Sequence, residues 1–241
     1  MPVHIYGQPC EMKIISKIAD DHNLEIIEDC SQAHGAEIEG QKVGTFGSLG
    51  AFSCYPTKNL GGTGDGGIIL AKSEKLTKKL QSIRQYGWNQ ERESTSGGYN
   101  SRLDEMQAAI LRVKLQYLQN SNEKRRHIAH RYNSAFKGLP ITLPTIHPDE
   151  LHAMHLYVIE VQQRDKLLHF LKEQGIGASL HYPLPVHLHK AYANRIPGNN
   201  DLAVTENFYQ KHLTLPMFPE LENEQVDQII KYIQSWFNSL E

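Results

Sequence analysis

Short apolar runs alternate with segments of helical spacing along the first half of the chain. Apolar residues that recur every three or four positions predict helices, and short continuous apolar runs predict strands. Strands are expected at residues 3–6, 24–27, 49–54 and 67–71, and helices at 9–22 and 74–86. The first strand, the first helix and the second strand would form a βαβ unit with a right-handed crossover. Ser73 is expected to cap the second helix, with Leu76, Leu80 and Ile83 buried beneath it.

The second half begins with a polar loop over residues 87–100, which Gly97 and Gly98 interrupt. Two helices follow at 103–119 and 121–136, and the three prolines of residues 138–148 indicate an extended linker. Strands at 155–161, 176–182 and 213–215, and helices at 164–174, 202–212 and 223–240, the last capped by Asn223, complete the pattern. The order predicts an α/β large domain over residues 1–138 and a small α+β domain over residues 139–241.

The composition is that of a globular protein, with 39% hydrophobic and 22% charged residues among 241. A net charge of −2 gives no electrostatic reason to expect a nucleic-acid partner. No apolar run is long enough for a membrane span, and no signal peptide is recognisable. The three cysteines are widely spaced, which is typical of reduced thiols in the cytoplasm. The 13 histidines are scattered without a Cys-x-x-Cys pair, so no metal site is expected.

A basic run on the helix expected at 121–136 has two interpretations. Its members are Lys124, Arg125, Arg126, His127, His130 and Arg131. They could form a nucleic-acid patch, or they could be the solvated face of a helix. No aromatic residues are interleaved with them and the whole chain is slightly acidic, so we favour the solvated face.

Lys58 stands between two predicted strands, in a turn where five of the seven residues 61–67 are glycine. Such a backbone turns tightly and approaches a bound group closely. A lysine forms a Schiff base with a carbonyl group once its amine has lost a proton. The alternative is an ordinary solvated lysine in a hairpin loop.

Polar residues also follow the strand expected at 24–27, and they decide between these two interpretations. Asp29 and Gln32 come after that strand, and Ser53 and Lys58 come at the end of the next one. In open α/β sheets, ligands bind at the carboxyl ends of the strands. An acid and a lysine there suit pyridoxal phosphate (PLP): the lysine holds its aldehyde, and the carboxylate pairs with its pyridinium nitrogen.

Five motifs in order carry a resemblance to a known family. They are Glu28-Asp-Cys-Ser-Gln-Ala-His-Gly35, Phe52-Ser-Cys-Tyr-Pro-Thr-Lys-Asn-Leu-Gly61, Gly64-Asp-Gly-Gly67, Gly98-Tyr-Asn-Ser-Arg-Leu-Asp-Glu105 and His181-Tyr-Pro-Leu-Pro-Val-His187. Together they resemble the DegT/DnrJ/EryC1/StrS family of PLP-dependent sugar aminotransferases, from Val3 to about Trp236. The resemblance implies part of an aspartate aminotransferase-like, type I fold. It also implies that the N-terminal third of a family member, with a phosphate-binding turn, several strands and a ring-stacking aromatic, is not matched here.

The resemblance also implies roles for individual residues. Lys58 would be the catalytic Schiff-base lysine and Asp29 would keep the pyridine nitrogen protonated, although an aspartate after a strand is otherwise a common turn residue. Gln32 would bind the phenolic oxygen and Ser53 the phosphate. Asn100 would reach the phosphate of the second subunit in a homodimer, or else belong to a helix N-terminus.

Three further residues resemble groups on the sugar side of the family's site. They are His181, His187 and Tyr55, each of which could instead be a packed loop residue.

Dehydratase relatives carry histidine at the position of Lys58, so the lysine favours transamination. The motif Tyr-Pro-Thr-Lys-Asn-Leu-Gly resembles that of relatives that act on 3-keto rather than 4-keto sugars. The implied substrates are a nucleotide-linked keto-deoxyhexose and glutamate. Low activity of this chain alone is expected; the alternative is a non-catalytic remnant or interaction module that needs a separate N-terminal piece.

Overall fold

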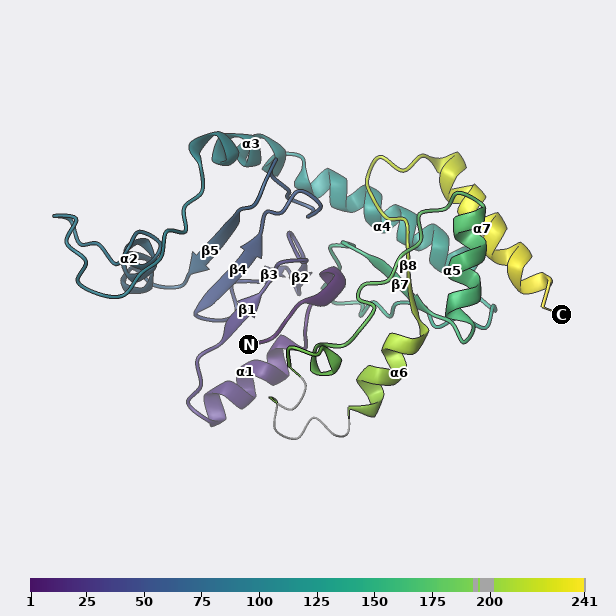
Figure 1. Cartoon of the computed structure of the whole chain (residues 1–241), viewed down its shortest axis with the longest axis horizontal. Coiled ribbons are helices and arrows are strands. Elements are labelled where there is room, and N and C mark those ends of the chain that lie inside the picture. The colour runs from purple at the N-terminus through teal and green to yellow at the C-terminus, as the bar shows by residue number, and fades with distance from the viewer. Residues whose placement is uncertain (193–194, 196–201, 241) are drawn as a thin grey trace. The chain divides into compact units, whose positions relative to one another are not determined.

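The computed structural model describes residues 1–192, 195 and 202–240 (Figure 1). The chain divides into two compact units, which are described separately below. Unit 1 comprises Met1–Arg126 and Ile146–His155, and unit 2 comprises His127–Thr145 and Leu156–Glu241. The boundary expected between residues 138 and 139 falls within the first segment of unit 2.

The central sheet of unit 1 has three strands in the order β1-β4-β5. They are β1 (Ile27–Asp29), β4 (Leu49–Ser53) and β5 (Gly67–Ala71). β1 runs parallel to β4, and β5 runs antiparallel to it. β1 begins later than expected, because Leu24 is exposed and residues 24–26 lie outside the ladder.

The strand expected at residues 3–6 is reduced to a single parallel bridge from Val3 to Asp29. The chain then enters the short 3₁₀ helix η1 (Ile5–Gly7). Tyr6 has φ of 60°, in the left-handed region, which is incompatible with a continuing strand. This turn brings the Tyr6 backbone towards the end of β1.

Four helices belong wholly or partly to unit 1. They are α1 (Met12–Asp21), α2 (Glu74–Ile83), α3 (Glu105–Leu115) and α4 (Leu118–Ala135), which continues into unit 2. The cap predicted for α2 is confirmed: Ser73 Oγ accepts a hydrogen bond from Leu76 N–H at 3.3 Å. The burial predicted for Leu76, Leu80 and Ile83 is wrong, because all three are only partly buried.

A small second sheet lies beside the central one in unit 1. The hairpin of β2 (Glu37–Ile38) and β3 (Gln41–Lys42) is joined on its other side by β6 (Glu150–Leu151). Two apolar clusters fill this unit: Cys30, Ala33, Ala36, Val43 and Ala153 form one, and Cys54, Leu60 and Leu111 form the other. The segments that flank Asp29 and Lys58 therefore have buried anchors.

Unit 2 combines a two-stranded antiparallel sheet with helices. Its elements are β7 (Tyr157–Glu160), α5 (Arg164–Glu173), η2 (Val186–Leu188), α6 (Ala203–Lys211), β8 (His212–Leu215) and α7 (Asn223–Asn238). The strand predicted at 176–182 is wrong, because only Ser179 pairs, in one bridge with Thr214. The cap of α7 is Glu222 rather than Asn223, and its N–H donates to Gln225 Oε1 at 2.9 Å.

The basic run on α4 is not a uniformly solvated face, which corrects the interpretation favoured from the sequence. Arg125 is 7% exposed, and its Nη1 lies 3.3 Å from both the Met154 and the His155 carbonyl oxygens. Arg126 Nη1 donates to the His152 carbonyl at 3.4 Å. These guanidinium groups hold a loop of unit 1 on the helix, a function that sequence spacing alone does not indicate.

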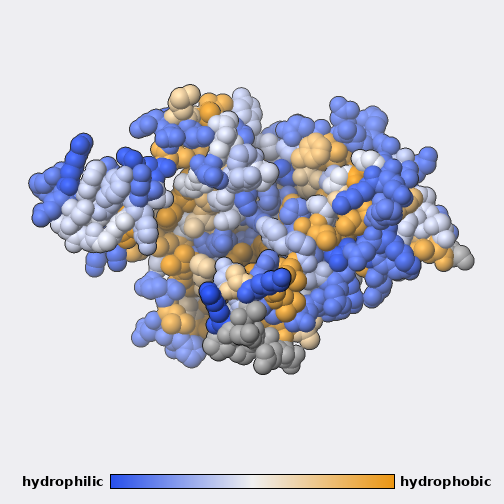
Figure 2. Space-filling view, viewed as in Figure 1, coloured by the Kyte–Doolittle hydropathy of each residue, from blue (hydrophilic) through white to orange (hydrophobic). Residues whose placement is uncertain are grey.

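The face shown in Figure 2 is largely hydrophilic, with hydrophobic residues between the hydrophilic ones. On α3 and just after it, Met106, Val113 and Tyr117 are all more than half exposed. Their spacing places them along one face of a helix. Among the described residues, no helix is long and apolar enough to cross a membrane.

Candidate active site

Two neighbouring strands of unit 1 end at the same edge of the sheet. Asp29 is the last residue of β1, and the parallel register pairs it with Ala51 of β4. Ser53 ends β4 two residues later, and Lys58 follows in a turn closed by a hydrogen bond from its N–H to the Tyr55 carbonyl at 2.9 Å. The structure therefore brings Asp29, Ser53 and Lys58 to one edge.

Lys58 is partly buried, and its surroundings change its acidity. Burial lowers the pKa of Lys58 below the ordinary value of 10.5, and the negative charge of Asp29 opposes this shift. Removing an ammonium group from water favours its neutral form, which is the nucleophilic one. Burial therefore makes the amine of Lys58 easier to deprotonate, and the Asp29 carboxylate is close enough to oppose that shift.

Hydrogen bonds from backbone N–H groups orient Asp29, Gln32 and Ser53. Asp29 Oδ1 accepts the N–H of Ser31 at 3.0 Å. Gln32 Oε1 accepts the N–H of Tyr6 at 2.6 Å. The NH₂ group of the same amide is the part that can donate a hydrogen bond. Ser53 Oγ accepts the N–H of Tyr55 at 3.3 Å.

Asn100 and Tyr55 occupy other positions in unit 1. Asn100 Oδ1 accepts from Arg102 Nε at 2.9 Å, and the residue lines an open cleft of about 680 Å³ beside β5 and α2. Neither Lys58 nor Asp29 is among the described residues that line this cleft. Tyr55 is 50% exposed.

His181 and His187 belong to unit 2. His181 Nδ1 lies 3.0 Å from Thr214 Oγ1. His187 is buried, and its Nε2 lies 3.0 Å from Glu206 Oε1, which ties η2 to α6. Both histidines thus have hydrogen-bond partners within their own unit.

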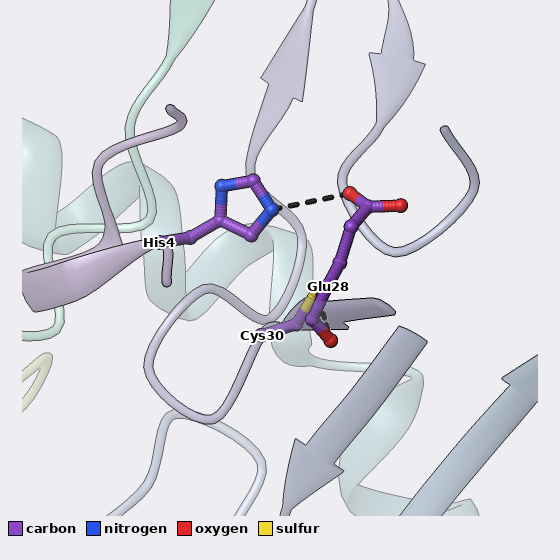
Figure 3. Close-up of side chains that lie close together, drawn as sticks. All are labelled: His4, Glu28 and Cys30. Carbon is purple, nitrogen blue, oxygen red and sulfur yellow. Dashed lines mark hydrogen bonds and ion pairs between the residues drawn. The ribbon is translucent and has the colours of Figure 1, made fainter. Parts of the chain in front are cut away.

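A buried carboxylate beside Asp29 was not predicted. Figure 3 shows His4, Glu28 and Cys30 together, with His4 Nε2 3.1 Å from Glu28 Oε2. The same carboxylate accepts the backbone N–H groups of Gly44, Phe46 and Gly47 at 2.7, 2.8 and 2.7 Å. Burial raises the pKa of Glu28, but the hydrogen bonds from His4, Gly47 and Gly44 outweigh it, so the net shift is downward. The one feature of the sequence that indicates a different environment for Glu28 is strand alternation, which places neighbouring side chains on opposite faces of a strand. Glu28 therefore faces away from Asp29.

The same three side chains place possible metal ligands within 4.8 Å of one another. Cys10 N–H donates to His4 Nδ1 at 3.0 Å, which leaves the ring proton on Nε2, facing Glu28. Both the imidazole and the carboxylate are therefore used in hydrogen bonds. We interpret the cluster as a clamp on the Gly44–Gly47 loop, and we call it the Glu28 clamp.

His34 is a second residue to which the sequence assigned no role. It is 3% exposed, its ring lies 5.4 Å from that of Phe52, and neither ring nitrogen makes a hydrogen bond of good geometry. Burial and the charge of Lys58 lower its pKa to about 4, against an opposing effect of the Ser53 backbone. The imidazole beside Lys58 is therefore neutral near pH 7.

Comparison with known proteins decides the family. The model of the DegT/DnrJ/EryC1/StrS aminotransferase family matches residues 1–234. The chain belongs to this family. The family is PLP-dependent, and several of the relatives that the chain matches are named as sugar transaminases.

Relatives of known function agree with that assignment. The chain is 42% identical to the dTDP-3-amino-3,4,6-trideoxy-alpha-D-glucose transaminase of Streptomyces venezuelae, over 98% of this chain and 62% of that protein. It is 41% identical to the UDP-N-acetyl-3-dehydro-alpha-D-glucosamine 3-aminotransferase of Acidithiobacillus ferrooxidans, over 97% of this chain and 63% of that protein. The chain thus spans less than two thirds of the length of these relatives.

Solved structures bear out the predicted fold. The crystal structure of S. venezuelae DesV in complex with a ketimine intermediate has a TM-score of 0.94 and 42% identity, covering 97% of this chain and 63% of that one. A DegT/DnrJ/EryC1/StrS aminotransferase from Brucella abortus has a TM-score of 0.93 and 36% identity, covering 98% and 63%. The prediction of a partial PLP-dependent transferase fold is confirmed.

Proposed function

We propose that this chain forms the lysine-bearing part of a PLP-dependent nucleotide-sugar aminotransferase. The observation that carries the proposal is Lys58, whose pKa is lowered by burial and which lies beside Asp29 at one edge of the sheet. A nucleophilic amine next to a carboxylate is the pair that PLP chemistry needs. Family membership supports the same conclusion.

We assign each group of the cofactor to one residue in this part of the chain. When bound, PLP supplies an aldehyde carbon and an electron-withdrawing ring. Lys58 Nζ would be the group that holds that aldehyde carbon and would serve as the base that moves the proton at the reacting carbon. Asp29 would hold the proton on the pyridine nitrogen, Gln32 would bind the phenolic oxygen and Ser53 would bind the phosphate.

For the substrates, we propose a nucleotide-linked keto-deoxyhexose as acceptor and glutamate as donor. Two relatives are named for 3-amino sugars, which supports a 3-keto rather than a 4-keto acceptor. His181, His187 and Tyr55 would contribute to the sugar side of the site. A cytoplasmic location, where nucleotide sugars are made, completes this hypothesis.

We also propose that the active protein is a homodimer in which Asn100 reaches the phosphate of the partner's cofactor. Asn100 is exposed and lines the cleft beside β5 and α2, whose described lining does not include Lys58 or Asp29. The face of Met106, Val113 and Tyr117 offers an apolar surface that a second subunit would cover. Light scattering on the active protein tests this, and an active monomer would contradict it.

Labelling of Lys58 tests the cofactor site directly. The folded chain is incubated with PLP, reduced with borohydride and mapped by mass spectrometry. We expect the label on Lys58, its loss in Lys58→Ala, and its retention in Lys75→Ala, which removes an exposed lysine of α2. A folded protein labelled equally at Lys58 and at exposed lysines would contradict the proposal.

We expect this chain alone to turn over slowly, because it spans less than two thirds of the length of its relatives. A PLP site also needs phosphate donors and a ring-stacking group, and Ser53 would supply one phosphate contact. The assay is amino transfer from glutamate to a 3-keto or 4-keto nucleotide sugar with excess PLP. A rate of about 1 s⁻¹ or more would contradict this expectation. A folded chain with neither label nor turnover would favour the alternative, a non-catalytic remnant or interaction module.

A further inference from the structure

Asn59 follows Lys58 in the chain and uses its whole side-chain amide in hydrogen bonds. Its Nδ2 donates to Asn122 Oδ1 at 2.9 Å and to the Ala153 carbonyl at 2.8 Å. Its Oδ1 lies 3.0 Å from His155 Nδ1. Asn122 in turn donates from Nδ2 to the His34 carbonyl at 2.7 Å. We call these linked groups the Asn59 network, and all of them belong to unit 1.

Two backbone carbonyls fix the orientation of every group in the Asn59 network. A carbonyl oxygen only accepts, so the Ala153 carbonyl requires the NH₂ end of Asn59, and the His34 carbonyl requires the NH₂ end of Asn122. Asn59 Oδ1 therefore faces His155, which must carry its proton on Nδ1. Neither amide can rotate by half a turn without placing two acceptors face to face.

The network joins the Lys58 turn to the segment that carries the acid. Asn122, on α4, is 2% exposed, and it holds the backbone of His34, two residues after Gln32 and five after Asp29. Before Lys58, the turn is closed by the hydrogen bond from Lys58 N–H to the Tyr55 carbonyl. After it, Lys114 Nζ donates to the Gly61 carbonyl and Thr63 N–H donates to Gln107 Oε1. Among the described residues, the Asn59 network thus provides the long-range hydrogen bonds that lie closest to Lys58 in the chain.

We propose that Asn59 is a positioning residue that holds Lys58 in its partly buried place beside Asp29. This rests on the proposed function of Lys58 as the reactive amine and names a residue that sets its state. Loss of the network would let the turn move outward, where the Lys58 ammonium is better hydrated. The lowered pKa of Lys58 would then return towards the ordinary value.

The test measures the acidity of Lys58 without any cofactor. Reductive methylation with formaldehyde and cyanoborohydride, followed over pH by mass spectrometry, reports the neutral amine of each lysine. Lys75, exposed on α2, is the reference within the same sample. Asn59→Ala removes the network without adding charge, and Asn122→Ala breaks it one step from the turn. A third variant, Asn59→Asp, adds a negative charge at the network. Its control is Asn120→Asp, which adds the same charge at an exposed position of α4.

In Asn59→Ala and Asn122→Ala we expect the midpoint of Lys58 to rise towards that of Lys75. Asn59→Asp should raise it further, because a carboxylate would face two acceptors and would add negative charge near the amine. Asn120→Asp should leave it unchanged. Folding of each variant is checked by circular dichroism.

Unchanged midpoints in folded Asn59→Ala and Asn122→Ala would overturn the proposal. Unfolding of both variants would overturn it too, because the network would then support the fold rather than the lysine. The outcome is separable from that of the proposed function. A shifted midpoint without PLP labelling of the parent chain would leave Asn59 as a positioning residue and remove the cofactor role.

Discussion

Replacing Glu28 by glutamine removes half of a buried acceptor while keeping its shape. In the Glu28 clamp, Oε1 accepts the N–H groups of Phe46 and Gly47, and Oε2 accepts those of Gly44 and of the His4 ring. Glutamine has one oxygen and one NH₂. In either orientation of the amide, its NH₂ group takes the place of one carboxylate oxygen. The two donors that this oxygen accepted are then left without an acceptor.

The cost follows from the number of donors left without an acceptor. His4 cannot adapt by moving its proton, because its Nδ1 already accepts from Cys10 N–H. Each buried donor without an acceptor costs about 1–3 kcal/mol, so two cost about 2–6 kcal/mol in the free energy of unfolding. A domain is typically stable by about 5–15 kcal/mol, so the loss is a large part of the total.

Hydrogen exchange followed by mass spectrometry can assign the loss of stability to unit 1. A single unfolding curve of the whole chain cannot do so. Glu28→Gln should accelerate exchange at the amides of Gly44, Phe46 and Gly47 and lower the urea midpoint of the peptides around them. Glu91→Gln is the matched control, since Glu91 is exposed.

The pKa of Glu28 is lowered in the folded state, so the parent loses stability as the pH falls from about 4.5 downward through that lowered value. The variant should lack this loss.

A stability of Glu28→Gln within about 1 kcal/mol of Glu91→Gln would refute the reasoning. It would mean that water or a rearranged loop supplies the missing acceptor. Unchanged exchange at Gly44 would locate the error in the clamp itself.

Two further predictions concern His34 and Ser73. The pKa of His34 is about 4 in the folded state against 6.5 unfolded, so the unfolded state binds more protons between these values and stability falls as the pH falls. His34→Phe should remove this loss, at most about 3 kcal/mol, from urea titrations between pH 7 and pH 4; an unchanged acid slope would contradict it. Ser73→Ala should lower the stability of α2 by about 1 kcal/mol, seen as faster exchange at Leu76 N–H, and equal exchange rates would argue against the cap.

The sequence predicted what local rules and ordered motifs determine. Lys58 and Asp29 lie at one sheet edge because parallel strands end together. β4 was expected nearly where it occurs, whereas β1 was expected at residues 24–27 and lies at Ile27–Asp29. Ser73 caps α2 because a cap needs only neighbouring residues. The roles of the site residues remain predictions.

The partners of Asn59 could not be predicted, because they lie 63 and 94 residues away in the chain. The same distance problem hid the burial of Arg125, whose two carbonyl partners come 29 and 30 residues later. The strand expected at 176–182 failed for a different reason. An apolar run forms a strand only if a neighbouring backbone is in register, and only Ser179 finds one there.

The Glu28 clamp recognises main-chain atoms of the Gly44–Gly47 loop rather than its side chains. Thr45 is exposed and its N–H is not held by Glu28, so this position is open to many residue types. Proline is excluded at Gly44, Phe46 and Gly47, because it has no N–H to donate to Glu28. Gly44 and Gly47 must also stay glycine, because Gly44 has φ of 86° and a Cβ added at Gly47 would clash with the Ile26 carbonyl oxygen. Side-chain variation in this loop is therefore confined to Thr45, although the clamp itself contacts only main-chain atoms.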